Sequence, residues 1–176
     1  MDNSFFAYLQ QLELMAFFSG YPLLYALIFF VAGNKQSGNN FKKRIISALP
    51  YVYPVLGTLY LGLQLKNLYP DYSFENIKQT MQHPWLITWG LLSILFWIPA
   101  LGKKTILSLI HSLVFFFFLA RDLFLQLTSS SVAGDNSVIK NDMNVYSNSL
   151  LLNTGIFVFI LLLSFLFSLY KKSVRS

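Results

Sequence analysis

Five long apolar runs, separated by short polar segments, occupy most of this 176-residue chain. Each run is close to the length of about 20 residues that an α-helix needs to cross the hydrocarbon core of a bilayer. Because backbone groups in lipid must be satisfied within their own segment, we expect these runs to be helices. The sequence therefore predicts an all-α, polytopic membrane helix bundle with five transmembrane helices. The predicted spans are residues 14–33, 45–65, 85–101, 105–127 and 150–170.

Charged residues are distributed unevenly over the segments between these runs. All seven acidic residues fall towards one side of the membrane, six of them in the segments between the runs and Asp122 near the outer end of the fourth run. Most of the thirteen basic residues lie in the other segments, in clusters at 35–44, 103–104 and 171–175. Loops that are rich in Lys and Arg remain in the cytoplasm. We therefore expect the N-terminus outside, the C-terminus in the cytoplasm, and two outer loops at 66–84 and 128–149.

The composition excludes several classes of protein. With 55% hydrophobic and 11% charged residues, the chain is too apolar for a soluble domain, and the spans leave room for only a single transmembrane domain over residues 1–176. No cysteine is present, so disulfides and thiolate metal sites are excluded. The net charge of +6 comes from short clusters beside the spans, which orientation explains without nucleic acid as a partner.

Two of the predicted spans contain irregular positions. The first is interrupted by Ser19 and Pro22, and residues 1–13 before it form either a separate helix at the membrane surface or an extension of the same helix. In the second span, Pro50 and Pro54 each remove a backbone donor, so this helix is expected to bend towards protein. Hydroxyl donors for the freed carbonyls would come from Tyr51, Tyr53 and Tyr60.

The predicted loops carry their own signals. Ser73 is placed as the N-cap of a short amphipathic helix that ends at Pro84, either on the outer membrane surface or as a plug over the spans. Trp85 and Trp97 are placed as interface anchors at the two ends of the third span. A tight basic turn at residues 102–104 predicts an antiparallel hairpin of the third and fourth spans. The outer loop at 128–149 lacks hydrophobic periodicity and is expected to be mobile.

Ionisable groups within lipid are costly, so they are candidate functional residues by default. We hypothesise that Arg121 pairs across helices with Glu13, the alternative being that Arg121 extends to the headgroups. A buried His111 would relay protons or bind haem or a metal, or would hydrogen-bond to a neighbouring helix. The second interpretation is favoured, because no other ligand lies near His111 in sequence. The candidate residues are Glu13, Pro50, Pro54, His111, Arg121 and Asp122.

No catalytic, cofactor-binding or metal-binding motif is present in the sequence, so we expect a protein that is not an enzyme. We expect a scaffold, anchor or accessory subunit of a larger bacterial inner-membrane or envelope complex, in a homo- or hetero-oligomer with other membrane proteins. The frequent Phe, Asn and Lys suggest an AT-rich bacterial genome. An oligomeric channel or transporter subunit lined by the second span is the alternative, although the later spans show no continuous polar stripe. A membrane-embedded enzyme comes third.

Overall fold

The computed structural model describes residues 3–32, 40–80, 84–129 and 137–173, which form helices and contain no strand. Three stretches of these residues are long and apolar enough to cross a membrane, namely Gln11–Phe30, Arg44–Leu68 and Met143–Lys171. The prediction of an all-helical chain with helices that are long and apolar enough to cross a membrane is thus confirmed for the described residues. In chain order the elements are α1 (Asn3–Phe18), α2 (Tyr21–Ala32), α3 (Asn40–Leu68), α4 (Phe74–Thr80), α5 (Pro84–Leu91), η1 (Leu92–Trp97), α6 (Pro99–Gly102), α7 (Thr105–Ser129) and α8 (Ser137–Ser173).

The first predicted span is not one continuous helix. The helix breaks after Phe18 and resumes at Tyr21, so that α1 and α2 are separate. Ser19 donates its hydroxyl to the Met15 carbonyl oxygen at 2.6 Å, and Pro22 lies in the first turn of α2, where its missing N–H removes no intrahelical bond. Because α1 begins at Asn3, the segment before the span extends the first helix and is not a separate one. Residue 33 lies outside the described residues.

The core is aromatic and centres on α3. This helix contains Pro50 and Pro54 and extends beyond both ends of the predicted span 45–65. Tyr53 is fully buried, and its ring centroid lies 5.7 Å from that of Phe18 and 5.1 Å from that of Phe96. The Phe18 ring in turn stacks on Phe115 of α7 at 4.9 Å. Rings from α1, α3, η1 and α7 therefore meet in the middle of the bundle.

The predicted short helix after α3 is present as α4. The Ser73 hydroxyl oxygen accepts a hydrogen bond from the Asn76 backbone N–H at 3.3 Å, which confirms Ser73 as the N-cap. The Asp71 carboxylate accepts the Ser73 N–H at 2.9 Å and fixes the turn before it. The side chain of Phe74 is 79% exposed. Pro84, which was predicted to end this helix, is the first residue of α5.

The third predicted span, 85–101, is divided among α5, η1 and α6. Ile98 is extended, with φ −69° and ψ 122°, because the ring of Pro99 disfavours helical backbone in the residue before it. At the end of α6, a Cβ on Gly102 would collide with the Phe96 carbonyl oxygen, so glycine is required there. The turn at Lys103 and Lys104 then leads into α7, which gives the predicted hairpin.

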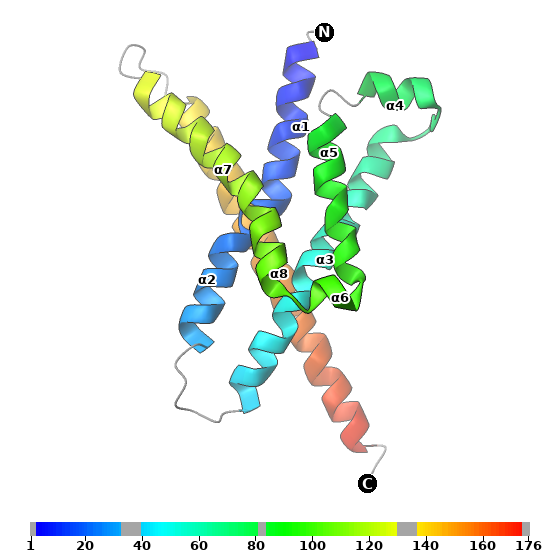
Figure 1. Cartoon of the computed structure of the whole chain (residues 1–176), viewed down its shortest axis with the longest axis vertical. Coiled ribbons are helices and arrows are strands. Elements are labelled where there is room, and N and C mark those ends of the chain that lie inside the picture. The colour runs from blue at the N-terminus through cyan, green and yellow to red at the C-terminus, as the bar shows by residue number, and fades with distance from the viewer. Residues whose placement is uncertain (1–2, 33–39, 81–83, 130–136, 174–176) are drawn as a thin grey trace.

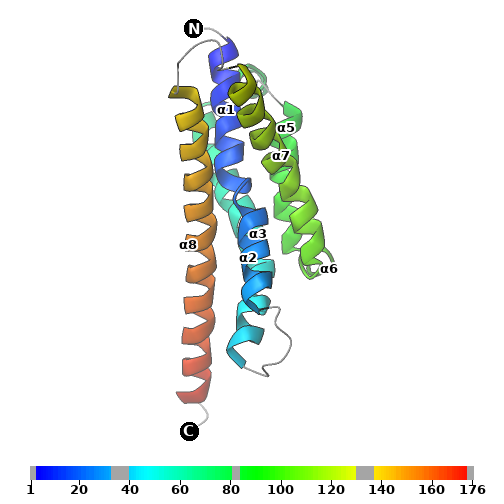
Figure 2. The same cartoon turned by 90° about the vertical axis from the view of Figure 1, so that its left-hand side faces the viewer.

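The last helix, α8, corrects the prediction of a mobile loop at 128–149. It begins at Ser137, so residues 137–149 are helical, while 130–136 lie outside the described residues. The polar first turns of α8 are stabilised by tertiary contacts that the sequence does not reveal. The ring of Tyr146 lies 6.2 Å from that of Phe116 on α7, and Ser149 is fully buried. Figure 2 shows α8 along one side of the bundle for almost its whole length.

The hairpin of α5, η1, α6 and α7 is shorter than the rest of the bundle. In Figure 1, α6 and the start of α7 lie part-way along the molecule, while the end of α2, the start of α3 and the end of α8 continue further towards the end at which the C-terminus lies. The same difference in height is visible in Figure 2. One end of the molecule is therefore formed by α2, α3 and α8 without the hairpin.

Candidate functional site

A polar face of α7 is buried against tyrosines from two other helices. Ser108, His111 and Ser112 are buried, and Thr105 lies one turn before them on the same face. The hydroxyls of Ser108 and Ser112 donate to carbonyl oxygens of their own helix at 2.8 Å each. These polar residues occupy only positions 105–112 of α7, and the run 113–120 that follows them is apolar, so they do not form a continuous stripe along the helix.

Three tyrosine hydroxyls reach this face. The Tyr21 hydroxyl lies 3.0 Å from that of Ser108, and the Tyr25 hydroxyl lies 3.3 Å from that of Thr105. From α3, the Tyr53 hydroxyl hydrogen-bonds to Nδ1 of His111. The rings of Tyr21 and Tyr53 pack at 4.7 Å, so α2 and α3 place these two tyrosines side by side against α7.

His111 is enclosed by aromatic rings. Its imidazole lies parallel to the Trp89 indole, with centroids 4.8 Å apart and an angle of 7° between the planes. The rings of Phe96 and Phe115 lie 5.8 and 5.9 Å away. Nε2 of His111 is buried and has no hydrogen-bond partner. The bond to Tyr53 is the contact with a neighbouring helix that the favoured interpretation predicts.

The two prolines of α3 flank the tyrosine that binds His111. Pro54 is buried, and its carbonyl oxygen accepts the Thr58 hydroxyl at 2.9 Å. The expectation that tyrosine hydroxyls cover the freed carbonyls is wrong, since the Tyr53 hydroxyl binds His111 and that of Tyr60 is buried without a partner. The third of these residues, Tyr51, is 56% exposed.

The charged candidates lie elsewhere. Glu13 of α1 is partly buried and accepts a hydrogen bond from the Asn67 side chain of α3 at 3.4 Å. Arg121 is exposed on α7. The described structure thus gives Glu13 a partner on α3, whereas the sequence suggested Arg121. Asp122 belongs to α7, but its side chain lies outside the described residues.

A second polar site, which sequence reasoning missed, joins α8 to the break between α1 and α2. The Ser149 hydroxyl accepts the Gly20 backbone N–H at 2.8 Å. One turn later, the Asn153 side chain donates to the Phe17 carbonyl oxygen at 3.0 Å. Groups freed by a helix break must be satisfied by neighbouring protein in lipid, and α8 supplies that cover. The spacing of these two buried polar residues within an apolar helix is the signal that was available in the sequence.

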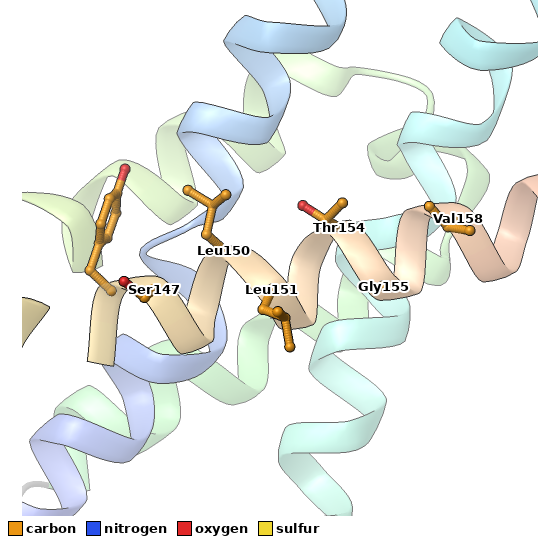
Figure 3. A pocket seen from close by; sticks show the side chains of 7 residues that line it. Ser147, Leu150, Leu151, Thr154, Gly155 and Val158 are labelled. Carbon is orange, nitrogen blue, oxygen red and sulfur yellow. The ribbon is translucent and has the colours of Figure 1, made fainter. Parts of the chain in front are cut away.

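Beyond this site, α8 carries an open apolar groove of about 640 Å³. Figure 3 shows Leu150 and Thr154 pointing to one side of α8 and Leu151 pointing to the other. A Cβ built at Gly155 would have no atom within 4 Å. The lining residues all belong to α8 and are Tyr146, Ser147, Leu150, Leu151, Thr154, Gly155 and Val158.

No family model, curated protein or solved structure matches this chain. Among the described residues, no three His, Cys, Asp or Glu side chains come together as a metal site. The tyrosine hydroxyls are bonded to groups of α7 and hold helices together, so the buried cluster orders the bundle.

Proposed function

We propose that this chain is a non-enzymatic subunit that assembles with other membrane proteins in a bacterial cytoplasmic membrane complex, as a scaffold or anchor. The proposal includes five membrane passes, with the N-terminus outside and the C-terminus in the cytoplasm, which the distribution of basic residues supports. The bacterial origin is supported by the bias towards Phe, Asn and Lys.

The observation that carries the proposal is the exposure of α8. In an apolar stretch of 18 residues within α8, only 11% of the residues are buried inside the protein. One side of the helix presents the open groove at Ser147, Thr154 and Gly155. Small residues allow the backbones of two membrane helices to approach closely. A helix that is anchored on one side by Ser149 and Asn153 and open on the other suits a contact with a further membrane helix.

Photo-crosslinking in native membranes tests this proposal. A photoreactive amino acid at Leu151 or Val158 should give discrete protein adducts in the host, while the same group at Phe30 of α2, which is 87% exposed, serves as the control. Adducts with lipid alone at all three positions would contradict the assembly role. Adducts with a second copy of the chain would favour the homo-oligomeric form.

An oligomeric channel is the second candidate, supported by the buried polar face of α7. The face of α3 that includes Tyr53 and Pro54 packs inside its own subunit, so α3 is a poor lining for a pore between subunits. Solute flux in proteoliposomes that is lost on replacing Pro50 and Pro54 would establish the channel in place of the scaffold. A membrane enzyme ranks third, and retained function after substituting Glu13, His111, Arg121 and Asp122 would oppose it.

A further inference from the structure

The tip of the hairpin carries two exposed lysines at a depth where the neighbouring helices are apolar. The level of the tip follows from its contacts with α3 and α2. Trp97, just before α6, donates its indole N–H to the Thr58 hydroxyl at 2.9 Å. Thr105, just after the tip, bonds to Tyr25 of α2. The tip therefore lies beside the middle of α3 and the middle of α2.

Both neighbours continue well past the tip. Arg44, which donates to the Ser168 hydroxyl of α8, lies fourteen residues before Thr58, or about 21 Å along the α3 axis at 1.5 Å per residue. The end of α2 at Ala32 lies seven residues beyond Tyr25, or about 10 Å. The tip thus stops about 10 to 20 Å short of the end of the bundle, against an apolar bilayer core of about 30 Å. Figure 1 shows this offset directly.

The part of the bundle beyond the tip has a surface suited to lipid. Its exposed side chains include Leu27 and Phe30 on α2, at 54% and 87% exposure, and Leu166 and Phe167 on α8, at 59% and 71%. These exposed side chains of α2 and α8 are called the apolar collar here, and placing so many large apolar side chains in water is what soluble protein surfaces avoid. Lys103 and Lys104, in contrast, are exposed charges that are costly in hydrocarbon.

The apolar collar can stay in lipid while the two lysines stay out of hydrocarbon only if the boundary of the membrane is not flat. We propose that Lys103 and Lys104 draw phospholipid phosphate groups and their water part-way into the apolar layer, so that the bilayer is locally thinned beneath the hairpin tip. Lysine side chains reach towards phosphates, and a bilayer thins beside a segment that is too short to cross it, each at modest cost. The partner of this surface is the lipid headgroup layer, which is a role beyond subunit assembly.

Single-cysteine labelling tests the proposal, since the chain has no cysteine of its own. The reporter is Ile106→Cys, which lies next to the tip and is 63% exposed. Leu166→Cys reports on the apolar collar, and Lys171→Cys at the end of α8 is the control for a water-exposed position. Each variant is reconstituted in vesicles of phosphatidylethanolamine and phosphatidylglycerol and treated with a membrane-impermeant maleimide on either side.

We expect Ile106→Cys to react from the same side as Lys171→Cys and at a rate of the same order, while Leu166→Cys stays unlabelled. Adding Lys103→Leu and Lys104→Leu to the Ile106→Cys reporter should abolish its labelling, because the charges that hold the headgroups are gone. Three results would overturn the proposal. Labelling of both Ile106→Cys and Leu166→Cys would place the collar in water. The proposal would also fail if Ile106→Cys stays unlabelled, or if its labelling persists after both lysines are replaced by leucine.

Discussion

Helices α3 and α8 are both long and apolar enough to cross a bilayer, yet they use their surfaces in opposite ways. In an apolar stretch of 18 residues within α3, 44% of the residues are buried inside the protein, whereas the figure for a stretch of the same length in α8 is 11%. The helix with the more uniform apolar sequence is the less buried of the two. Lipid tails are as apolar as leucine, so hydrophobicity alone does not draw helices together in a membrane.

What distinguishes the two helices is the contact chemistry along them. The buried face of α3 carries Tyr53, which binds His111, and Gly57, where a Cβ would collide with the Ser93 hydroxyl of η1. In α8, the buried groups of this kind are Ser149 and Asn153 near its first third, while Ser168 near its end accepts an exposed hydrogen bond from Arg44 of α3. Close approach and side-chain hydrogen bonds therefore decide which helix enters the core.

The largest effect is expected where the backbone of α8 packs against Gly20. A Cβ at Gly20 would lie 2.7 Å from the Leu150 backbone nitrogen, so Gly20→Ala should force α8 away and lower the free energy of unfolding by about 2 to 3 kcal/mol. Gly155→Ala on α8, where a Cβ meets nothing within 4 Å, is the control and should be close to neutral. Unfolding in SDS, followed by circular dichroism, measures both. Equal effects would contradict the close packing.

A smaller loss is expected from the polar anchor of α8. Asn153→Leu would leave the Phe17 carbonyl oxygen without its donor, at a cost of about 1 to 2 kcal/mol. The neighbouring Thr154 is exposed, so Thr154→Val should change the free energy of unfolding little. If both variants unfold at the same SDS fraction as the wild type, the anchor does not fix α8.

The bond between α3 and α7 should contribute about 1 kcal/mol or less. Tyr53→Phe removes the hydroxyl at His111 and keeps the ring, so the loss reports the hydrogen bond alone. Tyr51→Phe is the matched control, since Tyr51 is 56% exposed on the same helix. A double-mutant cycle with His111→Phe should show that the effects of Tyr53→Phe and His111→Phe are not additive. Strict additivity would show that the two side chains are not coupled.

The smallest effect on stability is expected on the outer surface of α8. Phe167 is 71% exposed, so Phe167→Ala should change the free energy of unfolding of the isolated chain by less than about 0.5 kcal/mol. A stability loss as large as that of Asn153→Leu would show that this part of α8 belongs to the core of the chain itself.

Much of the helical layout was predictable from local signals. The N-cap at Ser73, the basic turn at Lys103 and Lys104, and the helical hairpin all follow from residues close together in sequence. The extended residue before Pro99 also had a local signal, although the predicted span 85–101 included it in one continuous helix. The helical start of α8 had no local signal, and the contacts nearest to it are tertiary, from Tyr146 to Phe116 of α7 and from Ser149 to Gly20.

The sequence by itself determined that the chain is helical and apolar enough for a membrane, and that its charges are segregated. Only the tertiary structure decided that His111 meets Tyr53, that Glu13 meets Asn67, and that α8 closes the break at Gly20. The physical reason is that apolarity sets the solvent of a helix but not its neighbours. Neighbours are chosen by the few positions at which hydrogen-bonding groups and close-packed backbones fit together.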